Sequence, residues 1–152
     1  MSDDIVARLR RIYSGRYWAL MGLELLDAEP GWSRMRLVAR DDHLNTNDVV
    51  HGGVISALVD TTAGAAVRSL RDDAEIRERP HATSDLHVSY LSAATGRELI
   101  AEAKVVKAGR TLIFIEVDVT DERERKVARG LATMVITARP PKAREEAEQT
   151  GE

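Results

Sequence analysis

The sequence predicts an α+β domain in which a strongly curved antiparallel sheet wraps around one long central helix. The chain has 152 residues, 43% of them hydrophobic, which fits one globular domain with one core. Residues 53–70 have helical spacing and are apolar on nearly every side, and the segments after them alternate with a period of two. A helix of this kind is buried on several sides, which requires a sheet that curls around it.

Helical and extended segments precede the central helix. Residues 1–20 are expected to form an N-terminal helical segment, because apolar residues recur there at helical spacing. Two strands, residues 22–28 and 32–40, flank a turn at Glu29-Pro30-Gly31. Residues 41–50 are rich in Asp and Asn, which predicts a loop that leads into the helix.

Four further strands are expected after the central helix and a charged loop at residues 71–80. Turn residues separate these strands, so we expect them to form a meander: residues 81–91, 97–107, 111–120 and 126–139. Strict alternation along the first of them places Thr83 on the polar face, opposite to Leu86. Residues 140–152 begin with two prolines and hold no large apolar residue, which predicts a disordered, charged tail after a single domain at residues 21–139.

Composition excludes several classes of protein. The chain has no cysteine, which excludes a disulfide framework, a thiolate nucleophile and a Cys-ligated metal. The net charge of -3 provides no basic field for nucleic acid or anionic membranes. Residues 49–67 contain one charged residue, Asp60, and are long enough to span a membrane. The segment also holds several other polar residues, which together with Asp60 argue against a membrane span. His43, His51, Asp85 and His87 show no metal-ligand spacing, so no metal is expected, and without an apolar signal region we expect a cytoplasmic protein.

Three motifs surround the apolar helix. The most specific is H-x-N-x5-H-G-G-x6-D, from His43 to Asp60; the others are T-S-D-L-H-V-S-Y-L from Thr83 and K-A-G-R-T over residues 107–111. In this order they resemble the hotdog-fold acyl-CoA thioesterases of the phenylacetate-degradation (PaaI-like) type, over residues 21–139. The sequence departs from that pattern at Asp48, where many members have glycine.

The resemblance implies hydrolysis of an acyl- or aryl-acyl-CoA to the free acid and coenzyme A. Coenzyme A is then part of the substrate, and no separate cofactor is expected. Asp60 is expensive to bury unpaired, so a carboxylate in this helix suits a general base or nucleophile. Gly52 lies at the start of the helix, where an unpaired amide and the positive end of the helix dipole suit an oxyanion donor.

Three further residues are candidates for the catalytic site. Asn45 fits contact with the thioester or the water, although its loop position equally suits an Asx-turn. The resemblance implies that Thr83 helps to orient the attacking water, whereas the local pattern alone fits an exposed strand residue. His51 precedes the glycine pair, and we expect it to support the loop through hydrogen bonds rather than to act as the base.

Binding of the coenzyme A portion requires cations and a groove. The candidates for substrate or coenzyme A binding are Gly53, Lys107, Arg110 and Arg129, with Lys104 nearby. Lys107 and Arg110 flank one predicted turn, and Arg129 lies on the last strand. Cations are suited to phosphates, although exposed cations near turns are commonly only solvated.

Spacing along the helix predicts that the catalytic site is shared between two chains. Gly52 and Asp60 are eight residues apart, about 12 Å along a helix. One thioester carbonyl therefore does not readily touch both groups of a single chain. The resemblance implies the same arrangement, with sites at the interface of a homodimer and dimers paired into tetramers.

Other functions remain open at this point. A lipase-type esterase is excluded, because the chain has no G-x-S-x-G motif and is too short. A hotdog hydratase is disfavoured, because none of the four histidines has an Asp five residues before it. A non-catalytic acyl-CoA-binding domain gives no reason for Asp60 in the helix. The sequence leaves open the acyl group, and also the choice between attack by water and an anhydride formed on Asp60.

Overall fold

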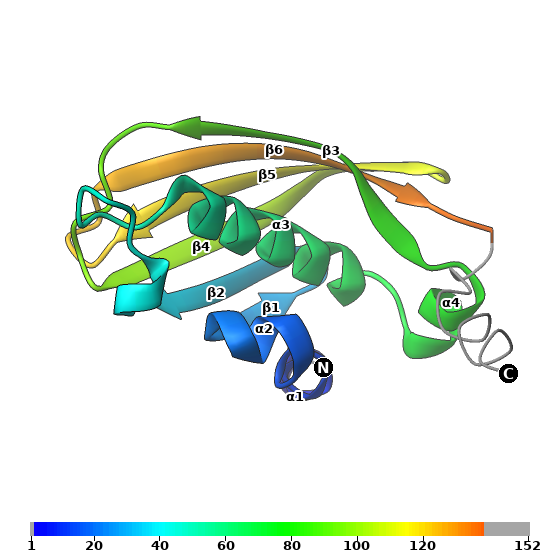
Figure 1. Ribbon diagram of the computed structural model, residues 1–152. Coiled ribbons are helices and arrows are strands. Elements are labelled where there is room, and N and C mark those ends of the chain that lie inside the picture. The colour runs from blue at the N-terminus through cyan, green and yellow to red at the C-terminus, as the bar shows by residue number, and fades with distance from the viewer. Residues whose placement is uncertain (1, 139–152) are drawn as a thin grey trace, which may run out of the picture.

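The computed structural model describes residues 2–138 and has the architecture that the sequence predicts (Figure 1). A six-stranded antiparallel sheet curves around helix α3 (Gly52–Ser69) in the order β1-β2-β4-β5-β6-β3. The strands are β1 (Leu23–Glu29), β2 (Trp32–Val38), β3 (His81–Tyr90), β4 (Glu98–Ala108), β5 (Leu112–Asp121) and β6 (Lys126–Ile136). This is the hotdog fold. The predicted tail, residues 140–152, lies outside the described residues.

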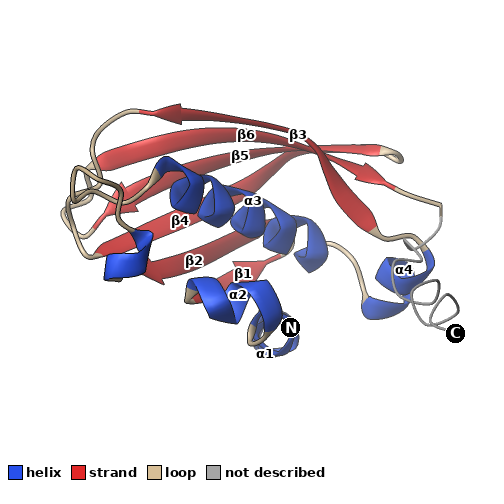
Figure 2. Cartoon of the chain, viewed as in Figure 1, coloured by secondary structure: helices blue, strands red, loops and turns tan. Residues whose placement is uncertain are grey.

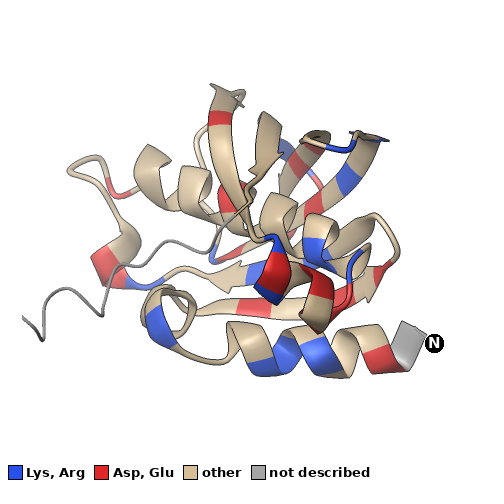
Figure 3. Cartoon of the chain, turned by 90° about the vertical axis from the view of Figure 1, so that its right-hand side faces the viewer, with Lys and Arg blue, Asp and Glu red and all other residues tan. Residues whose placement is uncertain are grey.

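The other described helices lie below the sheet in the view of Figure 2. They are α1 (Ser2–Tyr13), α2 (Arg16–Met21), α4 (Asp73–Glu78) and the 3-10 helix η1 (Asp41–His43). Helices α1 and α2 pack against β1. Helix α1, beside the N label in Figure 3, carries basic residues, of which Arg10 donates to the carbonyl oxygens of Leu25 and Leu26 in β1. One edge of the sheet is therefore covered.

The core lies between α3 and the concave face of the sheet. Helix α3 contacts every strand, and eleven of its residues are buried. The inward residues of β4 and β5 are those that strict alternation predicts: Leu99, Ala101, Ala103, Ile113, Ile115, Val117 and Val119. The helix is thus buried on several sides, as expected for a helix with almost no polar face.

The predicted meander of four strands is wrong. Strands β4, β5 and β6 form a meander, but β3 pairs with β6 and lies at the opposite edge from β1. The predicted charged loop at residues 71–80 is also wrong, since it contains α4. That helix begins with a capping box in which Asp72 accepts from the Glu75 amide and Glu75 accepts from the Asp72 amide.

A β-bulge changes the face on which Thr83 lies. Thr83 is paired with Met134 and Leu86 with Ala132, and both partners point into the core. The register shifts between Thr83 and Asp85, so Thr83 and Leu86 lie on the same, helix-facing side. The prediction that Thr83 lies on the face opposite to Leu86 is therefore wrong, because strict alternation does not allow for the extra residue.

Candidate active site

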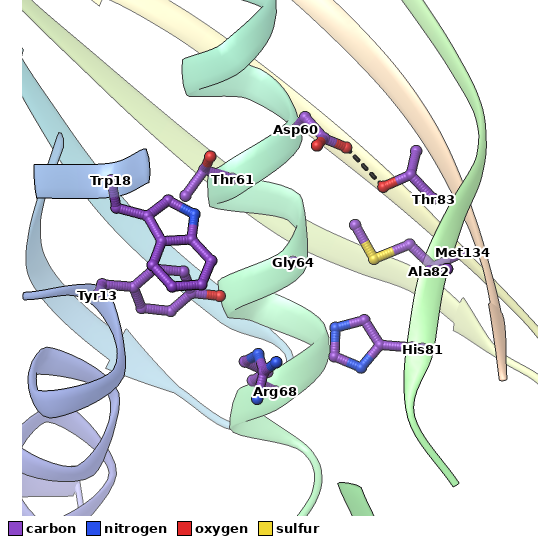
Figure 4. A pocket seen from close by; sticks show the side chains of 10 residues that line it. All are labelled: Tyr13, Trp18, Asp60, Thr61, Gly64, Arg68, His81, Ala82, Thr83 and Met134. Atoms are coloured by element: carbon purple, nitrogen blue, oxygen red, sulfur yellow. Dashed lines mark hydrogen bonds between the residues drawn. The ribbon is translucent and has the colours of Figure 1, made fainter. Parts of the chain in front are cut away.

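Asp60 and Thr83 meet beside the middle of α3. The Thr83 hydroxyl donates to Oδ1 of Asp60 at 2.6 Å (Figure 4). Asp60 is only partly buried, so its second oxygen has access to the neighbouring pocket. We call these two residues the carboxylate cluster. A fixed carboxylate in contact with a hydroxyl is a suitable base for a water molecule or a suitable nucleophile.

The first turn of α3 presents an unpaired amide. Gly52 is the first helical residue, and its N–H makes no hydrogen bond within the described residues. The next amide, of Gly53, donates to Nδ1 of the His51 side chain at 2.8 Å. His51 therefore acts as the N-cap, and the Gly53 amide is already engaged. Only the Gly52 amide of this pair is available to a substrate oxygen, at the positive end of the helix dipole.

Tyr90 holds this turn in place and was not singled out from the sequence. Its hydroxyl donates to the Gly52 carbonyl at 3.0 Å and lies 2.6 Å from Oγ of Ser56. The ring is so close to Gly52 that a Cβ there would lie 3.3 Å from it. Its place at the end of the T-S-D-L-H-V-S-Y-L motif was the available signal. We call Gly52, His51 and Tyr90 the amide cluster.

The loop before α3 is ordered by Asn45. Its Oδ1 accepts from the amides of Asn47 at 2.9 Å and Val49 at 3.4 Å, which is an Asx-turn arrangement. The Nδ2 group makes no hydrogen bond to the described residues. Asp48 has φ +56°, a left-handed conformation that favours glycine. This explains why a glycine is suited to that position and why Asp, a residue that tolerates it, is present here.

The candidate cations are dispersed. Lys107 is at the end of β4, and Arg110 lies in the turn that follows; both are exposed. Arg129 is on β6 and pairs with Glu116 at 3.1 Å and with Asp118 at 3.7 Å. The structure thus does not bring Arg129 together with the other two in a single chain.

A pocket of about 150 Å³ adjoins the carboxylate cluster. Its walls come from α1, α2, α3, the start of β3 and β6, and they include Tyr13, Trp18, Arg68 and His81 (Figure 4). None of these four residues was a candidate from the sequence. Arg68 had a local signal, because it follows Asp60 by eight residues and so shares a face of the helix. Tyr13 had no such signal, because only tertiary packing brings it to the pocket.

The two clusters lie apart on one helix. Gly52 and Asp60 are separated by eight residues of α3, about 12 Å along its axis. Among the residues that the structure describes, no group of three His, Asp or Glu side chains is placed to hold a metal ion. No described helix is long and apolar enough to cross a membrane.

Comparisons with known proteins agree with this geometry. A family model described as thioesterase superfamily matches residues 47–128. Acyl-coenzyme A thioesterase 13 of Homo sapiens is 30% identical over 113 residues, which are 73% of this chain and 77% of that protein. The structure of zebrafish thioesterase superfamily member 2 is 27% identical, with a TM-score of 0.75 over 86% of this chain and 97% of that chain. The E. coli PaaI protein from the phenylacetic acid degradation operon is 18% identical, with a TM-score of 0.78 over 89% and 94%, and shares the fold.

Proposed function

The chain belongs to the thioesterase superfamily, and we propose that it hydrolyses the thioester of an acyl-coenzyme A to the free acid and coenzyme A. The observation that carries this proposal is the 2.6 Å hydrogen bond between Thr83 and Asp60, which fixes a carboxylate at the mouth of a pocket. A relative named as an acyl-coenzyme A thioesterase supports the choice of substrate. A cytoplasmic location stays a prediction.

The reaction is expected to use both clusters. Asp60 removes a proton from a water molecule, the water oxygen forms a bond to the thioester carbon, and negative charge develops on the carbonyl oxygen. The unpaired Gly52 amide, at the positive end of the helix dipole, stabilises that oxygen. The carbon–sulfur bond then breaks, and the coenzyme A thiolate takes the proton from Asp60. Thr83 keeps the carboxylate oriented throughout.

An alternative first step is direct attack of Asp60 on the carbonyl, which forms an anhydride that water then hydrolyses. A single turnover in oxygen-18 water distinguishes the two routes. Direct attack followed by hydrolysis at the Asp60 carbonyl leaves label in Asp60, whereas general-base catalysis delivers it to the product acid. We favour general-base catalysis, because the Thr83 hydroxyl occupies one carboxylate oxygen and leaves the other for a water molecule.

A homodimer formed through β3 joins the two clusters. Strand β3 is an outer strand, is mostly exposed, and has backbone groups on one side that no described strand pairs with. Thr83 of the carboxylate cluster lies near its start, and Tyr90 of the amide cluster is its last residue. Antiparallel pairing of β3 with its copy places the start of one strand beside the end of the other. Asp60 of one protomer then lies beside Gly52 of its partner, and pairing of such dimers into tetramers stays a prediction.

A thiol-release assay with a panel of acyl-coenzyme A substrates tests the proposed activity. The wild-type chain is expected to release coenzyme A, and Asp60→Asn, which is nearly isosteric, is expected to remove almost all of that activity. Hydrolysis that is unaffected by Asp60→Asn would contradict the proposed mechanism.

Two other outcomes separate the alternative functions. A chain that binds acyl-coenzyme A and releases no thiol is a binding domain rather than an enzyme. A chain that adds water to an enoyl-coenzyme A is a hydratase, and the loss of absorbance of the conjugated double bond measures that reaction. We expect neither, since the described contacts of Asp60 leave it oriented towards the pocket where the thioester is proposed to lie.

A further inference from the structure

The pocket beside Asp60 is a short channel with different chemistry at its two ends. Asp60 and Thr83 lie at one end, and Arg68 and His81 lie at the other (Figure 4). Its volume of about 150 Å³ is similar to that of an engineered protein cavity that holds benzene. If the thioester lies at Asp60, the acyl group that fits beyond it has about six carbon-sized atoms.

One face of α3 forms the floor of this channel. Asp60, Gly64 and Arg68 are spaced by four residues and therefore lie in one row along the helix. Glycine in the middle of a helix is unfavourable relative to alanine by about 1 kcal/mol. A Cβ at Gly64 would meet only Met134 and Tyr13, both at 3.7 Å, which is ordinary contact. Packing of the chain therefore does not require glycine here, whereas a ligand that lies on the helix does benefit from the extra space.

The far end of the channel is cationic and rich in hydrogen-bond donors. The half-buried Arg68 makes no ion pair with any carboxylate of residues 4–138. The Nδ1 atom of His81 is buried and has no hydrogen-bond partner there. Burial, with Arg68 and Arg71 nearby, lowers the pKa of His81 to about 4, so its ring is neutral at pH 7. Burial raises the pKa of the Tyr13 phenol to about 12, so this group also stays protonated.

The distribution of charge determines which acyl group fits. Among the described residues Asp60 is the only carboxylate that lines the channel, and it lies at the proposed thioester end. The Arg68 side chain leans towards the N-terminus of the helix, which brings its guanidinium closer to Asp60 than the axial separation of about 12 Å. A half-buried guanidinium with no counter-ion among residues 4–138 lacks its preferred partner there, and an acyl group that ends in an anion supplies one.

We propose that this protein acts on coenzyme A thioesters of short dicarboxylic acids, and that Arg68 selects them by binding the free carboxylate at the far end of the acyl chain. This inference rests on the proposed function, since it assumes that the thioester lies at Asp60. Arg68 is a specificity residue in this scheme and takes no part in bond cleavage. His81 and Tyr13 complete the donors around the carboxylate.

The test compares glutaryl-coenzyme A with pentanoyl-coenzyme A, whose acyl chains have the same length and differ in a terminal carboxylate or methyl group. The wild type is expected to favour glutaryl-coenzyme A at least ten-fold in kcat/KM. Arg68→Met, which keeps the aliphatic length, is expected to bring the ratio close to one by loss on glutaryl-coenzyme A alone. Arg68→Lys should restore part of the preference. Arg77→Met, which removes an exposed cation on α4, is the matched control and should leave the ratio unchanged.

Several results would overturn the inference. A wild type that hydrolyses both substrates equally well has no carboxylate site, and equal losses on both substrates in Arg68→Met indicate a structural role for Arg68. If neither thioester is hydrolysed while other acyl-coenzyme A substrates of the panel are, the inference is overturned and the proposed function stands. If no substrate of the panel is hydrolysed, the proposed function fails, and calorimetric titration of the wild type with the same two compounds decides the inference. Tighter binding of glutaryl-coenzyme A then supports the carboxylate site, and equal affinities overturn it.

Discussion

The two clusters on helix α3 differ in the kind of group that they present, a hydrogen-bond donor at one and an acceptor at the other. The amide cluster, at the first turn, presents a donor without an acceptor: the Gly52 N–H is unpaired while His51 takes up the neighbouring amide. The carboxylate cluster, two turns further on, presents an acceptor whose position is fixed by the Thr83 hydroxyl. In the proposed mechanism neither cluster is sufficient for cleavage of a thioester, because one stabilises the oxyanion and the other activates the nucleophile.

The surroundings of the two clusters also differ. The amide cluster lies where the polar loop joins α3, and its covering residue Tyr90, from β3, is 53% exposed. The carboxylate cluster adjoins a channel whose walls come from five elements. The amide cluster therefore provides little that distinguishes one acyl group from another, and we expect specificity to depend on the channel beside Asp60.

The largest effect is expected from separating the two clusters onto different chains. Asp60→Asn removes the base, with an expected loss of about 10²–10⁴-fold, and Gly52→Pro removes the amide proton of the other cluster. Each homodimer should be almost inactive. A heterodimer of the two variants, co-expressed with two affinity tags and purified through both, has one intact site of two and should regain about half of the wild-type activity. A heterodimer no more active than either parent would show that each chain has its own complete site.

The amide cluster by itself is tested by two substitutions at Gly52. Proline is tolerated at the first helical position, and His51, with φ -60° and ψ 137°, has the conformation that a following proline requires. Gly52→Pro is expected to lower kcat by about 10²–10³-fold, as for loss of an oxyanion donor. Gly52→Ala introduces the same crowding against Tyr90 but keeps the N–H, so it is the control. Equal losses in both variants would assign the effect to crowding.

A pH effect on stability is expected at the channel beside the carboxylate cluster. The pKa of His81 is lowered from its ordinary value of 6.5 to about 4 in the folded chain, mainly by burial. The unfolded state then binds more protons between these values, so stability is complete above pH 6.5 and is lost as the pH falls towards 4. At pH 4.5 this amounts to about 2–3 kcal/mol. His81→Asn should remove that part of the decline in a comparison of denaturant unfolding at pH 7 and pH 4.5; identical declines would contradict the assignment.

The contribution of Thr83 to the carboxylate cluster is expected to be smaller. Thr83→Val keeps the shape of the side chain and removes the hydrogen bond to Asp60. Because a hydrogen bond to a charged group contributes about 1.5–3 kcal/mol and only part of it is expressed in the transition state, we expect about a ten-fold fall in kcat. Thr83→Ser keeps the hydroxyl and should retain most of the activity. A fully active valine variant would show that Asp60 is oriented by other contacts.

The smallest effect is expected at the floor of the channel. Gly64→Ala should raise the free energy of unfolding by about 1 kcal/mol, because alanine is the better helix former and its methyl group fits without a clash. It should also lower turnover of five-carbon acyl groups while leaving acetyl-coenzyme A, which is too short to reach Gly64, unaffected. Stabilisation without any change in acyl preference would show that acyl groups do not lie on this part of α3.

Local patterns predicted most of the fold and half of the site. The sequence pattern predicted the burial of the apolar residues of α3 and of the alternating residues of β4 and β5, because each element repeats its contact face at a fixed period. The glycine pair and the single carboxylate of residues 49–67 were recognisable for the same reason, since each breaks the pattern around it. Their spacing along the helix also predicted that Gly52 and Asp60 lie about 12 Å apart.

Tertiary structure decided the remaining features. The pairing of β3 with β6 rather than with β4 depends on the register of strands that are more than 35 residues apart in the chain, and no local window contains that information. The bulge after Thr83 reverses the face that alternation predicts and brings its hydroxyl to Asp60. Tyr13, Trp18 and His81 become neighbours of Arg68 only when α1, α2 and β3 pack around α3. The sequence by itself therefore indicated Asp60 and the Gly52-Gly53 pair as candidates for the chemistry, whereas the long-range packing of strands and helices determined which residues lie beside them.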